Sequence, residues 1–546
     1  MVSVLLSWVY IGITAGCVGI LVNQGIKKVF HYELQSIEVV IFSGLIAISS
    51  MAHVVSFFYP ISFGVHIILC SISILTCILF PKEIMGILTK ENKKSPYAYA
   101  IFFIGCMILC YFTSRGYEHT DTALYHGQAI RWLEEYGTVV GLGNINYRLG
   151  YNTSAFMLTA VYSMECFIGQ SLHTVGGFLA ILLWYVIILE YWNNKNKVLR
   201  ISDFVRLGAI YYLTITFSYL QSTSTDLATF LVLVYLIVKY VDLVERKERS
   251  ITPYALLSVA TCFAVTIKLS AAPVILLVLY PAICLIKEKK YKGIGLFISM
   301  GLLVIIPYLI RGVLLSGWLL YPSTSIDLFS FTFQVHEEVA HADQLAMVLW
   351  ARNAAYGETI IQWFPNWFLT AGGRLVQLLL IGDFLGLIAL IILWIVEIRE
   401  KGMKLNVLVL DITLVSSLIF WFATCPLVRY GYAYIILFVF YVIGRWSSRW
   451  ISTRLYRGFQ VACVLFCSIK LLTTLQFAAL FVEEPYYVWQ QDYEIFQGEL
   501  VEIDGVWYYK PNSEDQIGYH LFPTYLATVE WELRGRSVED GFQLKQ

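Results

Sequence analysis

Apolar runs long enough to cross a lipid bilayer follow one another along most of this chain. A membrane-spanning helix needs about 20 apolar residues, and windows of that kind recur between residues 3 and 482. Among the 546 residues, 58% are hydrophobic and 14% are charged, a far more apolar balance than that of a soluble domain. The sequence therefore predicts an all-α polytopic membrane protein.

We expect about fourteen transmembrane helices from these windows. They lie near residues 3–22, 37–57, 61–80, 97–114, 172–192, 205–221, 226–243, 252–267, 271–286, 293–314, 375–397, 405–424, 428–444 and 458–482. The first run lacks the basic start and the cleavage site of a signal peptide, so we expect it to remain as a span. Equal numbers of basic and acidic residues, 38 each, give no indication of a nucleic-acid partner.

Lysine and arginine predict the orientation, because loops rich in these residues stay in the cytoplasm. Seven basic segments fall on one side of the membrane if residues 154–168 do not cross it. These segments lie around residues 27–28, 82–94, 195–206, 246–249, 287–292, 399–404 and 445–457. We therefore expect residues 154–168 to form an interfacial helix, and both termini to face outward.

This topology divides the chain into three parts. Residues 1–96 are expected to form three N-terminal helices, and residues 97–482 a transmembrane core with outward loops at residues 115–171 and 315–374. Residues 483–546 are expected to form a small outward C-terminal segment.

A short amphipathic pattern follows in the first outward loop, where residues 129–136 read AIRWLEEY. An interfacial helix here would turn Ile130, Trp132 and Leu133 toward the membrane and Glu134 toward water.

Asp121 is the first candidate for chemistry. It lies just beyond the span that ends near Ser114, with Glu118 before it and Tyr125 and His126 one helical turn after it. A carboxylate at the membrane surface can take a proton from an acceptor hydroxyl, because partial desolvation makes it a stronger base. A solvated loop acid or a helix N-cap is the alternative for Asp121, and a structural hydrogen bond is the alternative for His126.

Five stretches in order carry a resemblance to a known superfamily. They are the pattern Asp121-x3-Tyr125-x3-Ala129-x7-Gly137, then NINYRLGYNTSAFMLTAVYSMECFIG, QSTSTDLATFLVLV with Asp226, FAVTIKLSAAPVILLVLYP with Lys268, and CPLVRYGYAY with Arg429 and Tyr430. Together, over roughly residues 97–440, they resemble the GT-C superfamily of polytopic glycosyltransferases. Its members include protein O-mannosyltransferases and lipid A aminoarabinose transferases, which take sugars from polyprenyl-phosphate donors.

The resemblance implies that Asp121 is the catalytic base or an acceptor-binding carboxylate. The substrates would be a polyprenyl-phosphate sugar donor and a glycan or lipid-linked acceptor at the outer face of the membrane. The residues expected around the acceptor are Glu118, Tyr125, His126 and Asp226. The outward cations available for the donor phosphate are Lys268, Arg429, Arg352 and Arg311.

Other roles for these charged residues stay open. Lys268 and Arg311 can extend toward lipid headgroups, and Asp226 can cap its helix or pair with Lys268. The chain also departs from the superfamily pattern, since it has three additional N-terminal helices and a lone Asp121 where an acid pair is common. We therefore predict no cofactor and no defined metal site, and leave a divalent metal ion as an alternative.

Two other classes of function compete with the transferase. A polymerase or ligase acting on polyprenyl-diphosphate glycans would place its chemistry in the late loop, where His336 and His341 lie among acids without conventional metal-ligand spacing. A polysaccharide or lipid transporter would need two related halves, and no internal repeat is visible. SGWLLYPST and LRGRSVEDGF also resemble stretches of little-studied bacterial polytopic proteins associated with surface polysaccharides.

Overall fold

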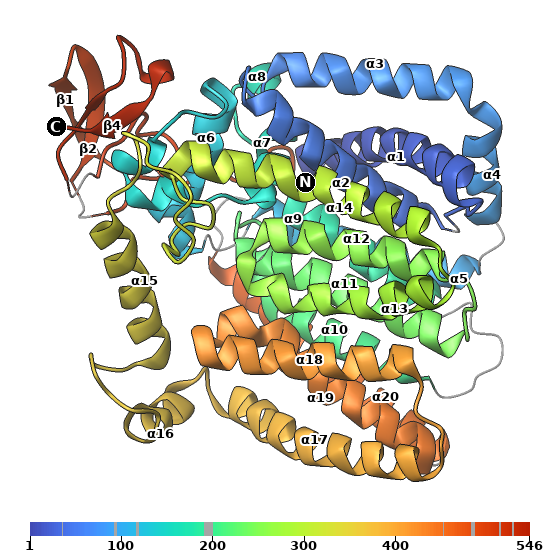
Figure 1. Ribbon diagram of the computed structural model, residues 1–546. Helices are drawn as coiled ribbons and strands as arrows, with labels where there is room; N and C mark the ends of the chain where they lie inside the picture. Colours follow the sequence, from blue (N-terminus) through green and yellow to red (C-terminus); the bar gives the residue numbers. More distant parts are fainter. Residues whose placement is uncertain are drawn as a thin grey trace.

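Most of the chain folds into helices that run side by side. The computed structural model describes residues 1–34, 36–91, 95–115, 119–190, 200–450, 453–481, 486–512, 515–526 and 529–545. Within these residues, nine helices are long and apolar enough to cross a membrane, or ten if the bent pair α3 and α4 forms one span. The predicted class, an all-α polytopic membrane protein, is thereby confirmed for the body of the molecule (Figure 1).

The helices and strands have the following bounds. The helices before the centre of the chain are α1 (Val2–Phe30), α2 (Ile37–Ser56), α3 (Phe63–Leu79), α4 (Pro81–Glu91), α5 (Pro96–Ser114), α6 (Gly127–Glu135), α7 (Ser154–Val161), α8 (Glu165–Ile168), α9 (Val175–Tyr185), α10 (Ile201–Thr216), α11 (Thr225–Glu245) and α12 (Thr252–Ile267). After them come α13 (Leu279–Lys287), α14 (Tyr291–Ser316), α15 (Glu337–Arg352), α16 (Ile360–Thr370), α17 (Arg374–Arg399), α18 (Leu405–Thr424), α19 (Val428–Trp450) and α20 (Thr453–Phe481). The strands are β1 (Gly498–Ile503), β2 (Val506–Pro511), β3 (Trp531–Leu533) and β4 (Phe542–Leu544).

Small residues allow the first two helices to pack closely. A Cβ atom at Gly44 of α2 would lie 1.8 Å from the backbone oxygen of Ala15 in α1, and one at Gly19 would lie 1.9 Å from the oxygen of Val40. Such close approach of backbones is typical of helix pairs in membranes. The N-terminal helices therefore form part of the same packed bundle, with α1 also lying against α3, α5 and α9.

One helix breaks where the sequence places a lysine between two apolar runs. α12 ends at Ile267, Lys268 has an extended backbone (φ −155°, ψ 131°), and the chain continues as the 3₁₀ helix η6 (Leu269–Val278) before α13. Pro273 lies inside η6 and cannot donate the backbone hydrogen bond that an α-helix requires there. The break leaves Lys268 at the end of α12.

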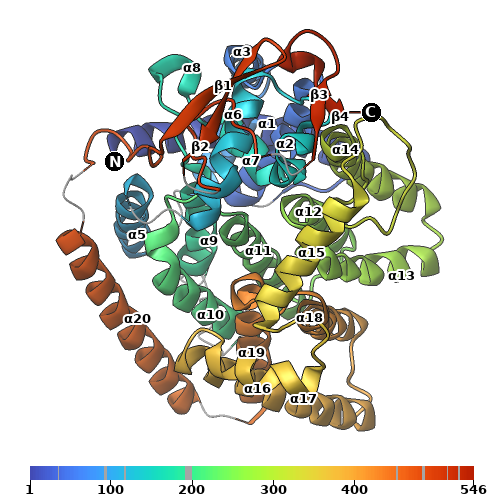
Figure 2. The same cartoon turned by 90° about the vertical axis from the view of Figure 1, so that its left-hand side faces the viewer.

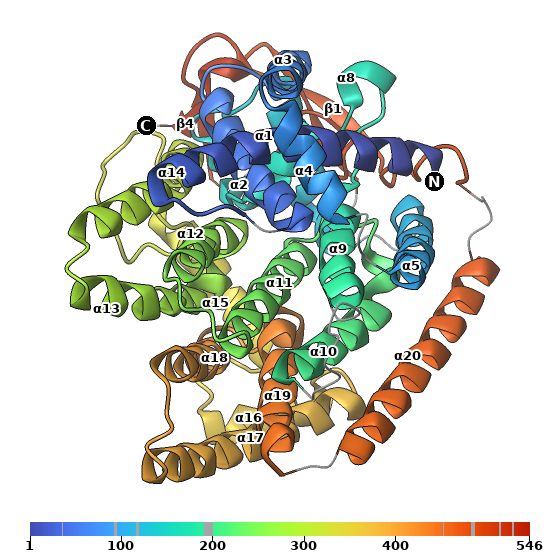
Figure 3. The ribbon, with the colours of Figure 1, turned by 90° about the vertical axis from the view of Figure 1, so that its right-hand side faces the viewer.

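The strands, α6, α15 and α16 gather at one end of the bundle, which we call the capped end (left in Figure 1). Figure 2 faces this end and shows α15 running across the ends of the central helices. Figure 3 shows the opposite end, where α4 lies, and α20 along one edge of the bundle. α20 packs against α10.

The described residues after α20, namely 486–512, 515–526 and 529–545, fold into a unit that we call the C-terminal cap. Its two antiparallel hairpins pair β1 with β2 and β3 with β4. The backbone N–H groups of Val2 and Ser3 donate to the oxygens of Tyr487 and Val488, both at 2.9 Å. The cap thus ties the start of α1 to the capped end, and it adds small β-sheets to a chain predicted to be all-α.

The cap also overturns the prediction for residues 129–136. Ile130, Trp132 and Leu133 are fully buried, and the Trp132 ring packs against the ring of Phe522 in the cap, with centroids 4.9 Å apart. Glu134, expected to face water, is buried as well. The apolar face of this amphipathic helix contacts folded protein, because α7 and the C-terminal cap pack against α6.

The segment at residues 154–168 also differs from its prediction. It forms α7 and the short α8, and all eight residues of α7 are buried. α7 packs against α2, α6 and α12. α7 therefore lies inside the protein and not along the membrane surface, whereas α8 exposes the apolar side chains of Phe167 and Ile168.

Candidate functional site

A cavity of about 620 Å³ lies at the capped end of the bundle. Its walls come from η1 (Thr122–His126) and the residues just before it, residues 147–156, the break around Lys268, one face of α15 and the start of α19. This volume is within the range of small-molecule sites, about 300–1,000 Å³. The cavity is the main candidate for a substrate site in the described part of the chain.

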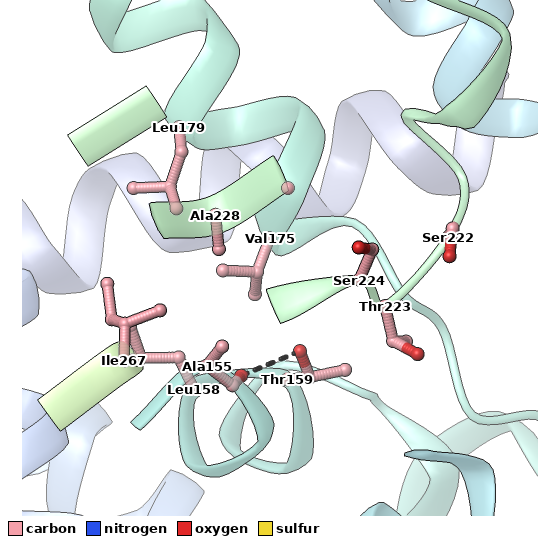
Figure 4. A pocket seen from close by; sticks show the side chains of 11 residues that line it. Ala155, Leu158, Thr159, Val175, Leu179, Ser222, Thr223, Ser224, Ala228 and Ile267 are labelled. Carbon is pink, nitrogen blue, oxygen red and sulfur yellow. Dashed lines mark hydrogen bonds between the residues drawn. The ribbon is translucent and has the colours of Figure 1, made fainter. Parts of the chain in front are cut away.

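A second, smaller pocket lies between α7, α9 and the start of α11. Figure 4 shows Thr159 and the loop residues Ser222, Thr223 and Ser224 beside the apolar side chains of Val175 and Ala228. Its volume of about 20 Å³ is enough for about one water molecule. It is therefore too small for an organic substrate.

Four charged residues meet at the larger cavity because each lies at the capped end of a helix. Asp121 directly precedes η1, and Asp226 lies in the first turn of α11. Lys268 follows the last residue of α12, and Arg429 is the second residue of α19. The structure thus brings together four residues that the sequence singled out separately.

Arg429 joins the two carboxylates of this group, which we call the charged cluster (Asp121, Asp226, Lys268 and Arg429). Its Nη2 lies 3.0 Å from Oδ2 of Asp121, and its Nε lies 3.4 Å from Oδ2 of Asp226. Lys268 forms an ion pair with Asp226. Pairing with Lys268 was one of the two roles predicted for Asp226, the other being a helix cap. The four side chains are 11–26% exposed, so solvent reaches them only partly.

The charges of the cluster balance, with two acids against two bases. Tyr430 adds an aromatic face, since its ring centre lies 3.4 Å from Nζ of Lys268 and 5.2 Å from the guanidinium carbon of Arg429. Trp350 of α15 lies 5.2 Å from the same guanidinium carbon. Cations held this way in a partly desolvated site interact more strongly with an anion than they would in water.

His119 is a member of the site that the sequence did not single out. Arg429 donates a hydrogen bond to its Nε2, and its Nδ1 lies 3.4 Å from Oδ2 of Asp121. Burial lowers the pKa of His119, and a ring nitrogen that accepts from a guanidinium carries no proton. His119 is therefore neutral and holds Arg429 beside Asp121. In the sequence, only its position two residues before Asp121 could have indicated that His119 belongs to the site.

Tyr125 lines the cavity, whereas its neighbour His126 lies behind the cavity wall. The ring of Tyr125 lines the cavity, and burial raises the pKa of its hydroxyl well above the usual value. His126 is 1% exposed and lies 3.4 Å, Nδ1 to Oγ1, from Thr223. Burial lowers the pKa of His126 well below its usual value. His126 is thus a neutral residue behind the cavity wall, which favours the structural alternative.

The other predicted site residues lie outside the charged cluster. Arg311 is buried, and its Nη1 donates to Oδ1 of Asn152 at 2.5 Å, next to the cavity. Arg352 donates to the backbone oxygen of Ala423 at 2.9 Å. His336, which directly precedes α15, and His341 of α15 are exposed and do not line the cavity. Glu118 is outside the described residues.

No metal-binding arrangement was found among the described residues, where no group of three or more histidine, cysteine, aspartate or glutamate side chains is placed to hold an ion. The eleven cysteines are all free thiols.

The fold and the cavity define a polytopic membrane protein with a charged site at one end of its helical bundle. Residues 1–436 match the family model described as "Domain of unknown function (DUF8201)", so the chain belongs to that family. No curated protein matches the chain. No solved structure matches it either.

Proposed function

We propose that the protein is a GT-C-type membrane glycosyltransferase. It transfers a sugar from a polyprenyl-phosphate donor to a glycan or lipid-linked acceptor, with Asp121 as general base. The observation that carries this proposal is the charged cluster itself, in which two cations and two carboxylates meet at the wall of a cavity of about 620 Å³. Such a site offers both an anion-binding group and a proton acceptor.

Asp121 is better placed than Asp226 to act as the base, for two reasons. Asp121 lines the cavity, whereas Asp226 does not. Asp226 also contacts two cations, Lys268 and Arg429, whereas the described partners of the Asp121 carboxylate are one cation, Arg429, and the neutral ring of His119. These two ion pairs hold Asp226 behind the cavity wall, whereas Asp121 can be reached by an acceptor hydroxyl in the cavity.

In the proposed step, the acceptor hydroxyl oxygen attacks C1 of the donor sugar. A new C1–O bond to the acceptor forms, and the bond between C1 and the phosphate oxygen breaks. The hydroxyl proton passes to the carboxylate of Asp121. The electron pair of the broken bond stays on polyprenyl phosphate, whose growing negative charge Lys268 and Arg429 stabilise. Arg311, close by and paired only with Asn152 among the described residues, adds positive potential.

We place this site at the outer face of a protein with fourteen spans and two outward termini. Besides the ten candidate spans that result when α3 and α4 count as one, the shorter helices α9, α10, α12 and the apolar half of α20 would complete the count. The basic ends of α1, α13 and α17 lie away from the capped end (Figure 1). By the positive-inside rule, that basic end is cytoplasmic.

The proposal can be tested in cells by measuring surface-glycan assembly at matched membrane expression. Asp121→Asn keeps the shape of the side chain but removes the base, so we expect glycan assembly to be lost. His341→Ala changes an exposed residue of α15 outside the cavity and serves as the control. Loss with His341→Ala alone would favour the polymerase or ligase, and loss with neither variant would refute the enzyme.

A further inference from the structure

We propose that the part of the cavity around Asp343, Tyr151 and Tyr321 binds the sugar ring of an uncharged, hydroxyl-rich acceptor. We call these three residues the tyrosine subsite. The inference rests on the proposed transferase function, and it assigns the acceptor a place separate from the charged cluster. None of the three residues belongs to that cluster.

The tyrosine subsite lies apart from the charged cluster along α15. The face of α15 toward the cavity carries Asp343, Ala346, Met347 and Trp350, a spacing of three to four residues that matches one side of a helix. Trp350 lies beside Arg429. Asp343 is seven residues earlier, about 10 Å along the helix axis at 1.5 Å per residue. A ligand in the cavity can therefore contact both places at once.

Asp343 has hydrogen-bonding capacity to spare. The hydroxyl of Tyr151 donates to it, and within the described residues no cation lies within ion-pair distance of its carboxylate. A carboxylate offers about four acceptor positions. Burial raises the pKa of Asp343, so the carboxyl is poorly solvated where it lies. Its remaining acceptor positions are available to hydroxyl groups of a ligand.

Tyr321 supplies the second observation. It is 6% exposed, it lines the cavity, and its hydroxyl is buried with no hydrogen-bond partner among the described residues. A buried polar group without a partner costs free energy, and a ligand that bonds to it recovers that cost. A sugar hydroxyl can donate to Asp343 and accept from Tyr321 at the same time, because a hydroxyl is both donor and acceptor.

The aromatic rings and the carboxylate favour a sugar over an anionic ligand. Ring centres are 5.6 Å apart between Tyr125 and Tyr151 and 5.5 Å apart between Tyr151 and Tyr321. These rings form a continuous wall from η1 to Tyr321, against which the C–H face of a sugar ring can pack. An anion would be repelled by Asp343, since Arg148, which also lines the cavity, is paired with Asp515 at 3.3 Å.

Two conservative variants test the subsite. Asp343→Asn keeps the acceptor for Tyr151 but removes the charge, and Tyr321→Phe removes only the hydroxyl. Glu338→Gln, on an exposed residue of α15, is the control for charge removal on this helix. Purified proteins in detergent are applied to an array of uncharged, anionic and cationic glycans, and decaprenyl phosphate binding is measured separately by thermal shift.

We expect the wild type to retain uncharged glycans. Each subsite variant should weaken that binding about tenfold, the loss expected for one hydrogen bond to a charged or buried partner, while the control and decaprenyl phosphate binding stay unchanged. Unaltered glycan binding in both variants, or a preference for charged glycans, overturns the inference. If the wild type binds decaprenyl phosphate but no glycan, only this inference fails. If it binds neither, the proposed function fails as well.

Discussion

Glu134 makes the docking of the C-terminal cap depend on pH. The carboxyl is 6% exposed and accepts hydrogen bonds from Ser171 at 2.7 Å and from Tyr519 of the cap at 2.6 Å. Burial outweighs these bonds and raises the pKa of Glu134 from 4.5 to about 7. The docked state therefore holds its proton more tightly than a state in which the cap has left and Glu134 is solvated.

The sign and size of the effect follow from this difference. Below pH 4.5 the carboxyl is protonated in both states, so docking is at its strongest. Between pH 4.5 and about 7 the undocked state loses its proton first, and docking weakens by about 1.4 kcal/mol per pH unit. The total loss is about 3 kcal/mol. Above pH 7 the carboxyl is ionised in both states and no further change is expected.

Hydrogen exchange can measure this opening. The backbone N–H groups of Ile517 and Gly518 donate to the oxygen of Ala123 at 3.0 and 2.8 Å, so their protection reports whether the cap is docked. Glu134→Gln keeps the size of the side chain and cannot ionise, and its comparison with the wild type at each pH cancels the chemical effect of pH on exchange. We expect protection to fall between pH 4.5 and 7 in the wild type only. Parallel curves for the two proteins would refute the reasoning.

Three further predictions concern packing, cap docking and the charged cluster. Gly177→Ala would place a Cβ atom 2.2 Å from Oγ1 of Thr113, whereas Gly176→Ala meets its nearest atom at 3.6 Å. We expect Gly177→Ala to destabilise the protein by about 1–3 kcal/mol and therefore to lower its melting temperature in detergent. Gly176→Ala should leave the melting temperature almost unchanged, and equal melting temperatures for the two variants would contradict this. Gln128→Leu removes hydrogen bonds of 2.6 and 3.2 Å to cap backbone oxygens, so limited proteolysis should cut the cap faster, and an unchanged rate would count against docking through Gln128. Arg429→Gln should lower the rate of sugar transfer about 100- to 1,000-fold, as the loss of one charge-stabilising donor does; a kinetic assay showing near wild-type rates would exclude its role.

The sequence was sufficient to predict the class of fold and to predict one common side of the membrane for the four residues of the charged cluster, but the contacts of Arg429 with both acids came only from the structure. Asp121, Asp226, Lys268 and Arg429 each stand at the end of an apolar run. Once the basic loops assign all those ends to one side of the membrane, the four residues must lie in one layer. No detailed knowledge of packing was needed for that step.

Contacts between distant segments could not be predicted in this way. Tyr151 and Asp343 are 192 residues apart in the sequence. Nothing in the residues around either one indicates that the two side chains form a hydrogen bond. The apolar face of α6 was assigned to the membrane because hydrophobic periodicity does not distinguish lipid from protein as its partner. Its partners are α7 and the C-terminal cap, and the short strands and irregular segments of the cap carry little periodic signal.

The central claim is that the charged cluster carries out sugar transfer from a lipid phosphate. The most direct measurement is a single-turnover assay in proteoliposomes with polyprenyl-phosphate donors labelled in both sugar and lipid. We predict that the wild type forms labelled glycan and free polyprenyl phosphate in equal amounts, and that Asp121→Asn forms neither, although it binds the donor. Equal turnover by the wild type and Asp121→Asn would contradict the account.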